Sequence, residues 1–166
     1  MTKPTLPTIP FKSPKSFETW LEKQHHKSTG IWMKIYKKDS GIKTITYAEA
    51  LDVALCFGWI DGQKQAFDEE CWLQKFCPRT AKSIWSKVNI GHVERLIQND
   101  KMRPAGLKAI ENAKADGRWD RAYDSPSKMT IPDDFLKELS KNKMAETFFK
   151  SLNKTNYSLL ILSSNM

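Results

Sequence analysis

The sequence lacks several features that would assign a protein to a class at once. No run of apolar residues approaches the ~20 that a membrane-spanning helix needs, and the first residues, MTKPTLPTIPFKSPK, contain no apolar segment of signal-peptide length. The three cysteines, Cys56, Cys71 and Cys77, include no CxxC pair, so neither a disulfide framework nor a zinc site is indicated. We therefore expect a soluble cytoplasmic protein without a membrane span, whose thiols are reduced and partly buried.

Short catalytic motifs are also missing. The sequence contains no HExxH, no GxSxG, no GxxxxGK[ST] and no GxGxxG after a predicted strand. His25 and His26 are adjacent on a predicted helix end, so their side chains diverge by about 100° and cannot both face one metal ion. No cysteine or carboxylate stands where it would make a recognisable triad with His92. We expect no metal, no cofactor and no catalytic residue, and we favour binding over catalysis.

Positive charge is abundant, and it is unevenly distributed. The 166 residues include 27 Lys and Arg and 19 Asp and Glu, a formal net charge of +8. Residues 1–48 carry nine Lys and three acids, residues 49–75 two Lys and six acids, and residues 76–108 seven basic and two acidic side chains. Such a balance can attract nucleic acid, phosphate or anionic lipid, and it is also an ordinary means of staying soluble. Nucleic-acid binding therefore stays among the hypotheses.

Periodicity and capping signals predict the elements of the first half. Ser13 as N-cap and Pro14 at the first helical position begin a helix, and the later segment IWMKIY alternates as a half-exposed strand does. Thr46 and Glu49 form a capping box before YAEALDVALCF, and Gly58 fits the left-handed position that ends that helix. QKQAF and CWLQKF then predict two short antiparallel strands with the acidic run DEE at their tip.

The second half is predicted to be mainly helical. Pro78 stops the last strand, and Thr80 or Ser83 can cap a helix through SIWSKVNIGHVERLIQ. Pro104 begins and Gly117 ends the next helix, a loop follows, and DDFLKEL and KMAETFFKSLN form two shorter helices. We predict an α+β fold, with a small antiparallel sheet of about three strands packed with helices and a helical C-terminal part. The expected parts are an extended segment at 1–12, a core domain at 13–124 and a helical extension at 125–166.

The segment FCPRTAKSIWS has more binding chemistry than any other. Arg79, Lys82 and Ser83 fall at the predicted helix start, where free N–H groups and the helix dipole favour a phosphate or carboxylate; the alternative is a capped helix with basic neighbours. Asp61 follows the helix exit, and we interpret it as a turn residue or a partner of Arg79, or else as a ligand anchor or general base. The candidate ligand-binding residues are Trp59, Asp61, Arg79, Lys82, Ser83, Trp85, Ser86 and Asn89.

Several longer segments together resemble one protein family. They are FETWLEKQH, GIWMKIYKK, TYAEALDVALCFGWIDGQ, FCPRTAKSIWSKVN, MRPAGLKAIENAKADGRWDRAY and the start of FFKSLNKTNYS, in order from about Phe17 to Asn156. They look like the bacterial YdeI/OmpD-associated proteins, also labelled bacteriocin-protection proteins. The resemblance implies a link to envelope stress or antimicrobial-peptide protection. It also implies a truncated C-terminal extension, because the chain turns into YSLLILSSNM where those relatives continue with a basic helical tail.

Three functional hypotheses follow from these observations. The first is a non-enzymatic, soluble binding protein of the YdeI/OmpD-associated type, whose partner is a small anionic ligand or another protein. The second is an enzyme or sensor that holds a phosphorylated or carboxylated ligand at Arg79, Lys82 and Ser83, with Asp61 as acid or base. The third is nucleic-acid binding, with an affinity that falls steeply with salt.

Overall fold

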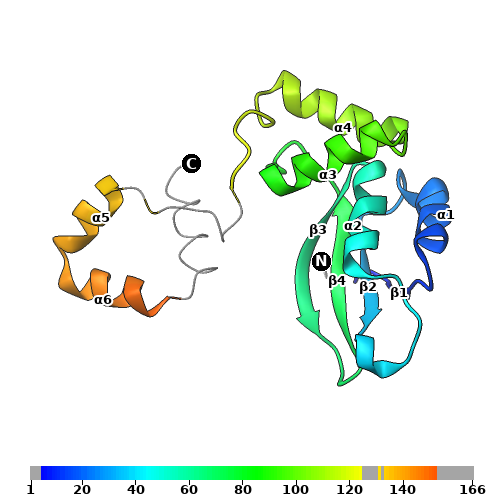
Figure 1. The fold of residues 1–166 in the computed structure, drawn as a ribbon, viewed down its shortest axis with the longest axis horizontal. Helices are drawn as coiled ribbons and strands as arrows, with labels where there is room; N and C mark the ends of the chain where they lie inside the picture. The colour runs from blue at the N-terminus through cyan, green and yellow to red at the C-terminus, as the bar shows by residue number, and fades with distance from the viewer. Residues whose placement is uncertain (1–4, 125–130, 132, 153–166) are drawn as a thin grey trace. The chain divides into compact units, whose positions relative to one another are not determined.

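The computed structural model describes residues 5–124, 131 and 133–152 (Figure 1). The chain divides into a larger unit within residues 1–85 and 89–122, and a smaller unit formed by residues 86–88 and 123–166. No helix within the described part of the chain is both long and apolar enough to span a membrane. The fold is α+β with a helical C-terminal part, as predicted.

The sheet of the larger unit has four strands in the order β1-β2-β4-β3. They are β1 (Thr8–Pro10), β2 (Ile31–Tyr36), β3 (Trp59–Ala66) and β4 (Cys71–Pro78). The β3–β4 hairpin and the antiparallel pairing of β2 with β4 agree with the predicted hairpin and strand. The three strands β2, β4 and β3 form the predicted antiparallel part of the sheet, and β1 adds a fourth strand that runs parallel to β2. This three-residue strand lies on the sheet edge, where Pro10 removes no internal hydrogen bond.

Two capped helices cover one face of this sheet (Figure 1). Ser13 and Ser16 make a capping box at α1 (Pro14–Gln24), and the predicted Thr46–Glu49 box begins α2 (Tyr47–Cys56). A short 3₁₀ turn, η1 (Lys38–Ser40), precedes α2. The buried side chains of β2 alternate with half-exposed ones, as predicted. The core where helices and sheet meet contains Phe17, Leu21, Ile31, Met33, Ile35, Leu51, Ala54, Leu55, Trp59 and Phe76.

Two glycines allow the end of α2 to lie against α4 (Pro104–Ala115). Gly58 has the predicted left-handed backbone, with φ of +71°, and a Cβ there would lie 2.9 Å from the Ala105 carbonyl oxygen. A Cβ on Gly106 would lie only 2.2 Å from the Cys56 carbonyl oxygen. Only glycine therefore permits this approach of the two backbones.

The helix after β4 begins later than the sequence indicated. α3 runs over Lys87–Gln98, so neither Thr80 nor Ser83 is its N-cap. Residues 79–86 form an irregular connection instead. The carbonyl oxygens of this connection accept hydrogen bonds from the side chains of Arg79 and Arg118, so they have partners without a helix.

The smaller unit contains the two short helices predicted near the C-terminus. They are α5 (Asp133–Ser140) and α6 (Lys143–Ser151), and the rings of Phe135 and Phe149 lie 5.3 Å apart between them. Within the same unit, Lys87 forms an ion pair of 2.7 Å with Asp124. The predicted truncation concerns residues 153–166, which lie outside the described residues. Residues 125–130 and 132 of the predicted loop also lie outside them.

Candidate functional site

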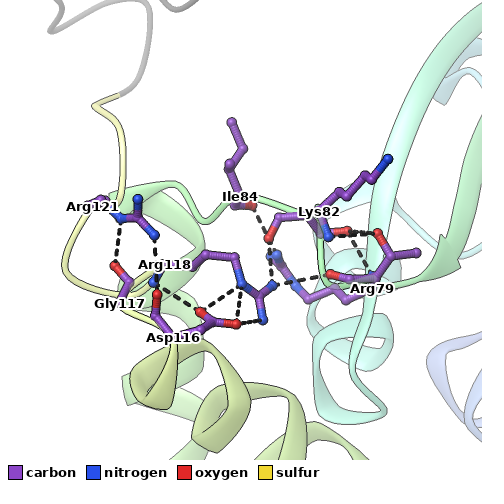
Figure 2. A network of polar contacts seen from close by, with 9 residues as sticks. Arg79, Lys82, Ile84, Asp116, Gly117, Arg118 and Arg121 are labelled. Carbon is purple, nitrogen blue, oxygen red and sulfur yellow. Dashed lines mark hydrogen bonds and ion pairs between the residues drawn. The ribbon is translucent and has the colours of Figure 1, made fainter. Parts of the chain in front are cut away.

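Arg118 holds the 79–86 connection from a distance in sequence. Its Nη1 donates hydrogen bonds to the carbonyl oxygens of Thr80 (3.2 Å) and Ser83 (3.0 Å), as Figure 2 shows. Its Nε donates to both carboxylate oxygens of Asp116, and its Nη2 lies 2.7 Å from one of them. The carboxylate thus fixes the guanidinium, and the guanidinium fixes the connection.

Arg79 is fixed by stacking as well as by hydrogen bonds. Its guanidinium carbon lies 3.5 Å from the centroid of the Trp85 ring, and its Nη1 donates to the Ile84 carbonyl oxygen at 3.1 Å. Trp85 is only 2% exposed and packs at 5.0 Å from Trp119. A planar cation on a buried indole is a favourable arrangement that also restricts the rotamers of the arginine.

A pocket of about 520 Å³ opens between this connection and α4, and we call it the Arg79 pocket. Three cationic side chains line it, Arg79, Lys108 and Arg118, against one carboxylate, Asp116. Counting unit charges, the lining carries +2. Asn112 adds an amide that can donate and accept hydrogen bonds. This combination of charges can attract a phosphate or a carboxylate.

Two of the predicted anion ligands do not line this pocket. Lys82 is exposed and its side chain extends away from the Arg118 guanidinium (Figure 2). The Ser83 hydroxyl accepts a hydrogen bond from the backbone N–H of Thr80 at 2.9 Å and so closes a local turn. The predicted helix start at these residues was wrong, because α3 begins only at Lys87. The basic lining comes from side chains on three separate segments.

Asp61 has a different partner from the one predicted. Its Oδ2 accepts a hydrogen bond of 2.7 Å from the Tyr47 hydroxyl, and it lines a separate pocket of about 350 Å³ with Lys64 and Trp72. Asp61 lies within β3, opposite Phe76 in the hairpin register, so the prediction of a turn residue was wrong. The structure therefore places Asp61 and Arg79 in different pockets, which corrects the single combined site of the second hypothesis.

Three other candidate residues, Trp59, Ser86 and Asn89, do not line the Arg79 pocket. Trp59 is 1% exposed in the core, and its Nε1 donates to the His25 carbonyl oxygen at 3.3 Å. Ser86 is buried and forms a β-bridge with Tyr123, and Asn89 lies in the first turn of α3. Of the eight candidates, Arg79 is the one that lines the pocket, with Trp85 as the ring beneath it.

Residues 9–109 match the family model of a domain of unknown function, DUF8412. The chain belongs to the DUF8412 family. The matched span includes Arg79 and Lys108, whereas Arg118 lies beyond it. Comparison with curated proteins and with solved structures gave no match. The resemblance to the YdeI/OmpD-associated proteins remains a prediction from the sequence.

Sequence reasoning missed a second charged cluster of this DUF8412 chain. Asp52 on α2 binds His92 Nδ1 at 2.8 Å and Arg95 Nη2 at 2.7 Å, both on α3. Partial burial raises the pKa of Asp52, but hydrogen bonds from Arg95 and His92 outweigh it, so the pKa lies below its usual value. The partners are 40 or more residues apart in sequence, and no local motif relates them.

Proposed function

We propose that this DUF8412 protein binds a small anionic ligand in the Arg79 pocket and acts by binding rather than by catalysis. The observation that carries the proposal is the lining itself, in which Arg79, Lys108 and Arg118 face one carboxylate. Because Asp116 is paired with Arg118, the carboxylate of the lining offsets that arginine, and Arg79 and Lys108 add two further positive charges to the lining. An anion between them would relieve the repulsion of two like charges.

The pocket also favours binding on grounds of size and rigidity. Its volume of about 520 Å³ falls within the range of small-molecule sites. Arg79 is stacked on Trp85 and Arg118 is paired with Asp116, so both guanidinium groups are ordered before a ligand arrives. Preorganised groups lose little conformational entropy on binding. The ligand class is a phosphorylated or carboxylated metabolite.

The biological setting we propose is the cytoplasm and protection against envelope stress or antimicrobial peptides. Its support is the resemblance to the YdeI/OmpD-associated proteins. A protein of net charge +8 repels a cationic peptide. We therefore propose that protection depends on the anionic ligand, and that the protein does not sequester the toxin directly.

A thermal-shift titration with pyrophosphate and citrate tests the binding proposal. A ligand that binds only the folded state stabilises it by about 2.7 kcal/mol at a hundredfold excess over Kd. We expect at least one probe to raise the Tm of the wild type, and the rise to be largely lost in Lys108→Ala. Lys108 is the residue to change because it is exposed on α4, whereas truncation of Arg79 would also uncover the Trp85 ring.

Lys82→Ala is the matched control, because it removes the same charge from the neighbouring connection and does not line the pocket. This variant is expected to keep the full ligand-induced shift. If no probe shifts the wild type, or if Lys82→Ala loses as much as Lys108→Ala, the Arg79 pocket is not an anion site.

A further inference from the structure

A second pocket, of about 540 Å³, lies between α1, α2 and the end of α3. We call it the Asp100 pocket. Its apolar lining is contributed by Val53, Cys56, Phe57 and Leu96. Burial, the main cause, raises the pKa of the Cys56 thiol to about 11, so this group is neutral at physiological pH and behaves as a small apolar side chain. The pocket can thus accept an apolar group.

The rim of the Asp100 pocket carries charges of both signs, and most of them are already paired. Glu18 is bound by Lys15 at 2.9 Å and by Arg103, and Asp52 is bound by His92 and Arg95 as described above. Glu49 accepts hydrogen bonds from the backbone and side chain of Thr46 in the α2 capping box. These groups shape the rim and leave little charge for a ligand.

Three polar groups of the lining have no hydrogen-bond or ion-pair partner within the described part of the chain. Within residues 5–124, 131 and 133–152, the side chains of Asp100 and Lys101 have no hydrogen-bond or ion-pair partner. The Arg103 Nε is buried and has no acceptor among the described residues. Asp100 and Lys101 are exposed, so their charges are accessible to a ligand, whereas the Arg103 guanidinium also pairs with Glu18 and Glu22. The Asp100 carboxylate and the Lys101 ammonium group, neither with a partner among the described residues, therefore border an apolar floor beside the Arg103 guanidinium.

The backbone at Asp100 gives an independent reason to assign it a role. Its φ of +54° is the one positive value at a non-glycine position in the part of the chain that the structure describes. Asp100 N–H donates to the Ile97 carbonyl and Lys101 N–H to the Leu96 carbonyl, which is the bond pattern of a helix end that favours glycine. The helix end explains the backbone and does not explain the carboxylate. Strain of this kind is often retained at binding sites.

We propose that the Asp100 pocket binds a small zwitterion with an apolar side chain, such as a free apolar amino acid. The ligand ammonium is held by Asp100, its carboxylate by Lys101 and the Arg103 guanidinium, and its side chain by the floor around Val53 and Phe57. The site shares no lining residue with the Arg79 pocket, so the two proposals can fail separately.

Isothermal titration with L-leucine and L-phenylalanine tests the site, using N-acetyl-leucine and leucine amide as probes that each lack one ligand charge. We expect one of the free amino acids to bind the wild type and each blocked probe to bind at least about tenfold more weakly. If neither amino acid binds, or if the blocked probes bind equally well, the proposal is overturned.

Asp100→Gly separates the ligand role from a structural one. Glycine suits the positive φ, so this variant is expected to have a raised Tm while its amino-acid affinity falls at least about tenfold. Asp100→Asn should show the same loss of affinity, because it keeps the shape and removes the charge. Asp120→Asn, an exposed acid outside the pocket, is the charge-matched control and should bind like the wild type. Unchanged affinity in Asp100→Gly would overturn the assignment.

Discussion

Gly106→Ala tests the junction on which both pockets depend. The added Cβ would lie 2.2 Å from the Cys56 carbonyl oxygen, 2.7 Å from the Met102 methyl carbon and 2.8 Å from the Cys56 carbonyl carbon. Two of these three neighbours are backbone atoms, so a side-chain rotation cannot relieve the contact. The N-terminus of α4 has to move away from the end of α2, and the hydrogen bond from Arg103 N–H to the same carbonyl, 3.1 Å long, is stretched.

The cost can be worked out from these contacts. Overpacking in a rigid site costs about 1–3 kcal/mol, and weakening one backbone hydrogen bond costs about 1 kcal/mol. Alanine recovers about 0.5–1 kcal/mol because glycine loses more backbone entropy in a helix. We expect a net loss of about 2 kcal/mol in the free energy of unfolding, and a Tm lower by about 4–8 °C for a chain of this size.

Gly91→Ala is the matched control for this prediction. Gly91 also lies in a helix, α3, but a Cβ there would have no neighbour within 4 Å. The same substitution should therefore stabilise the protein by about 0.5–1 kcal/mol. Urea unfolding followed by tryptophan fluorescence compares the two variants. If Gly106→Ala is neutral or stabilising, the close approach of α2 and α4 described above is wrong.

Two further predictions concern the caps and the charged cluster. Thr46→Ala should lower the free energy of unfolding by about 1 kcal/mol, because the first turn of α2 loses its N-cap; Thr29→Ala, at an exposed position, should have little effect in the same urea assay. Asp52→Asn should be less stable than the wild type at neutral pH, since hydrogen bonds from Arg95 and His92 hold the Asp52 pKa below its unfolded value despite partial burial. This contribution is present above about pH 4 and is lost as the pH falls through the folded pKa, so the two stability curves should converge in acid. A difference that stays constant with pH would show that Asp52 does not act through its charge.

Local signals in the sequence were sufficient for most of the fold. The capping box at Thr46, the alternation of β2 and the glycine at 58 each depend on residues close in sequence, and each is found as predicted. β1 was missed because its three residues, which follow Pro7 and end in Pro10, are too few to show a period. The start of α3 was misplaced because Arg118, 35 and 38 residues away, takes up the carbonyl groups of the preceding connection.

The candidate site was harder to predict because it is assembled from separate segments. Arg79 could be recognised from its own segment, but Lys108 and Arg118 reach the same pocket from α4 and from the chain beyond it. Lys82 is only three residues from Arg79 in the sequence, but its side chain extends away from the Arg118 network (Figure 2). Composition and spacing carry no information on which face of a connection a side chain occupies.

The most direct test of the central claim is an NMR titration of the ¹⁵N-labelled protein with pyrophosphate. The account predicts that amide signals of residues 79–81 and 108–112, which border the Arg79 pocket, shift together and saturate. Signals around the Asp100 pocket should stay in place and report that the fold is unchanged. Shifts that spread over all basic segments without saturation, or an absence of shifts at residues 79–81, would contradict the claim that the Arg79 pocket is an anion-binding site.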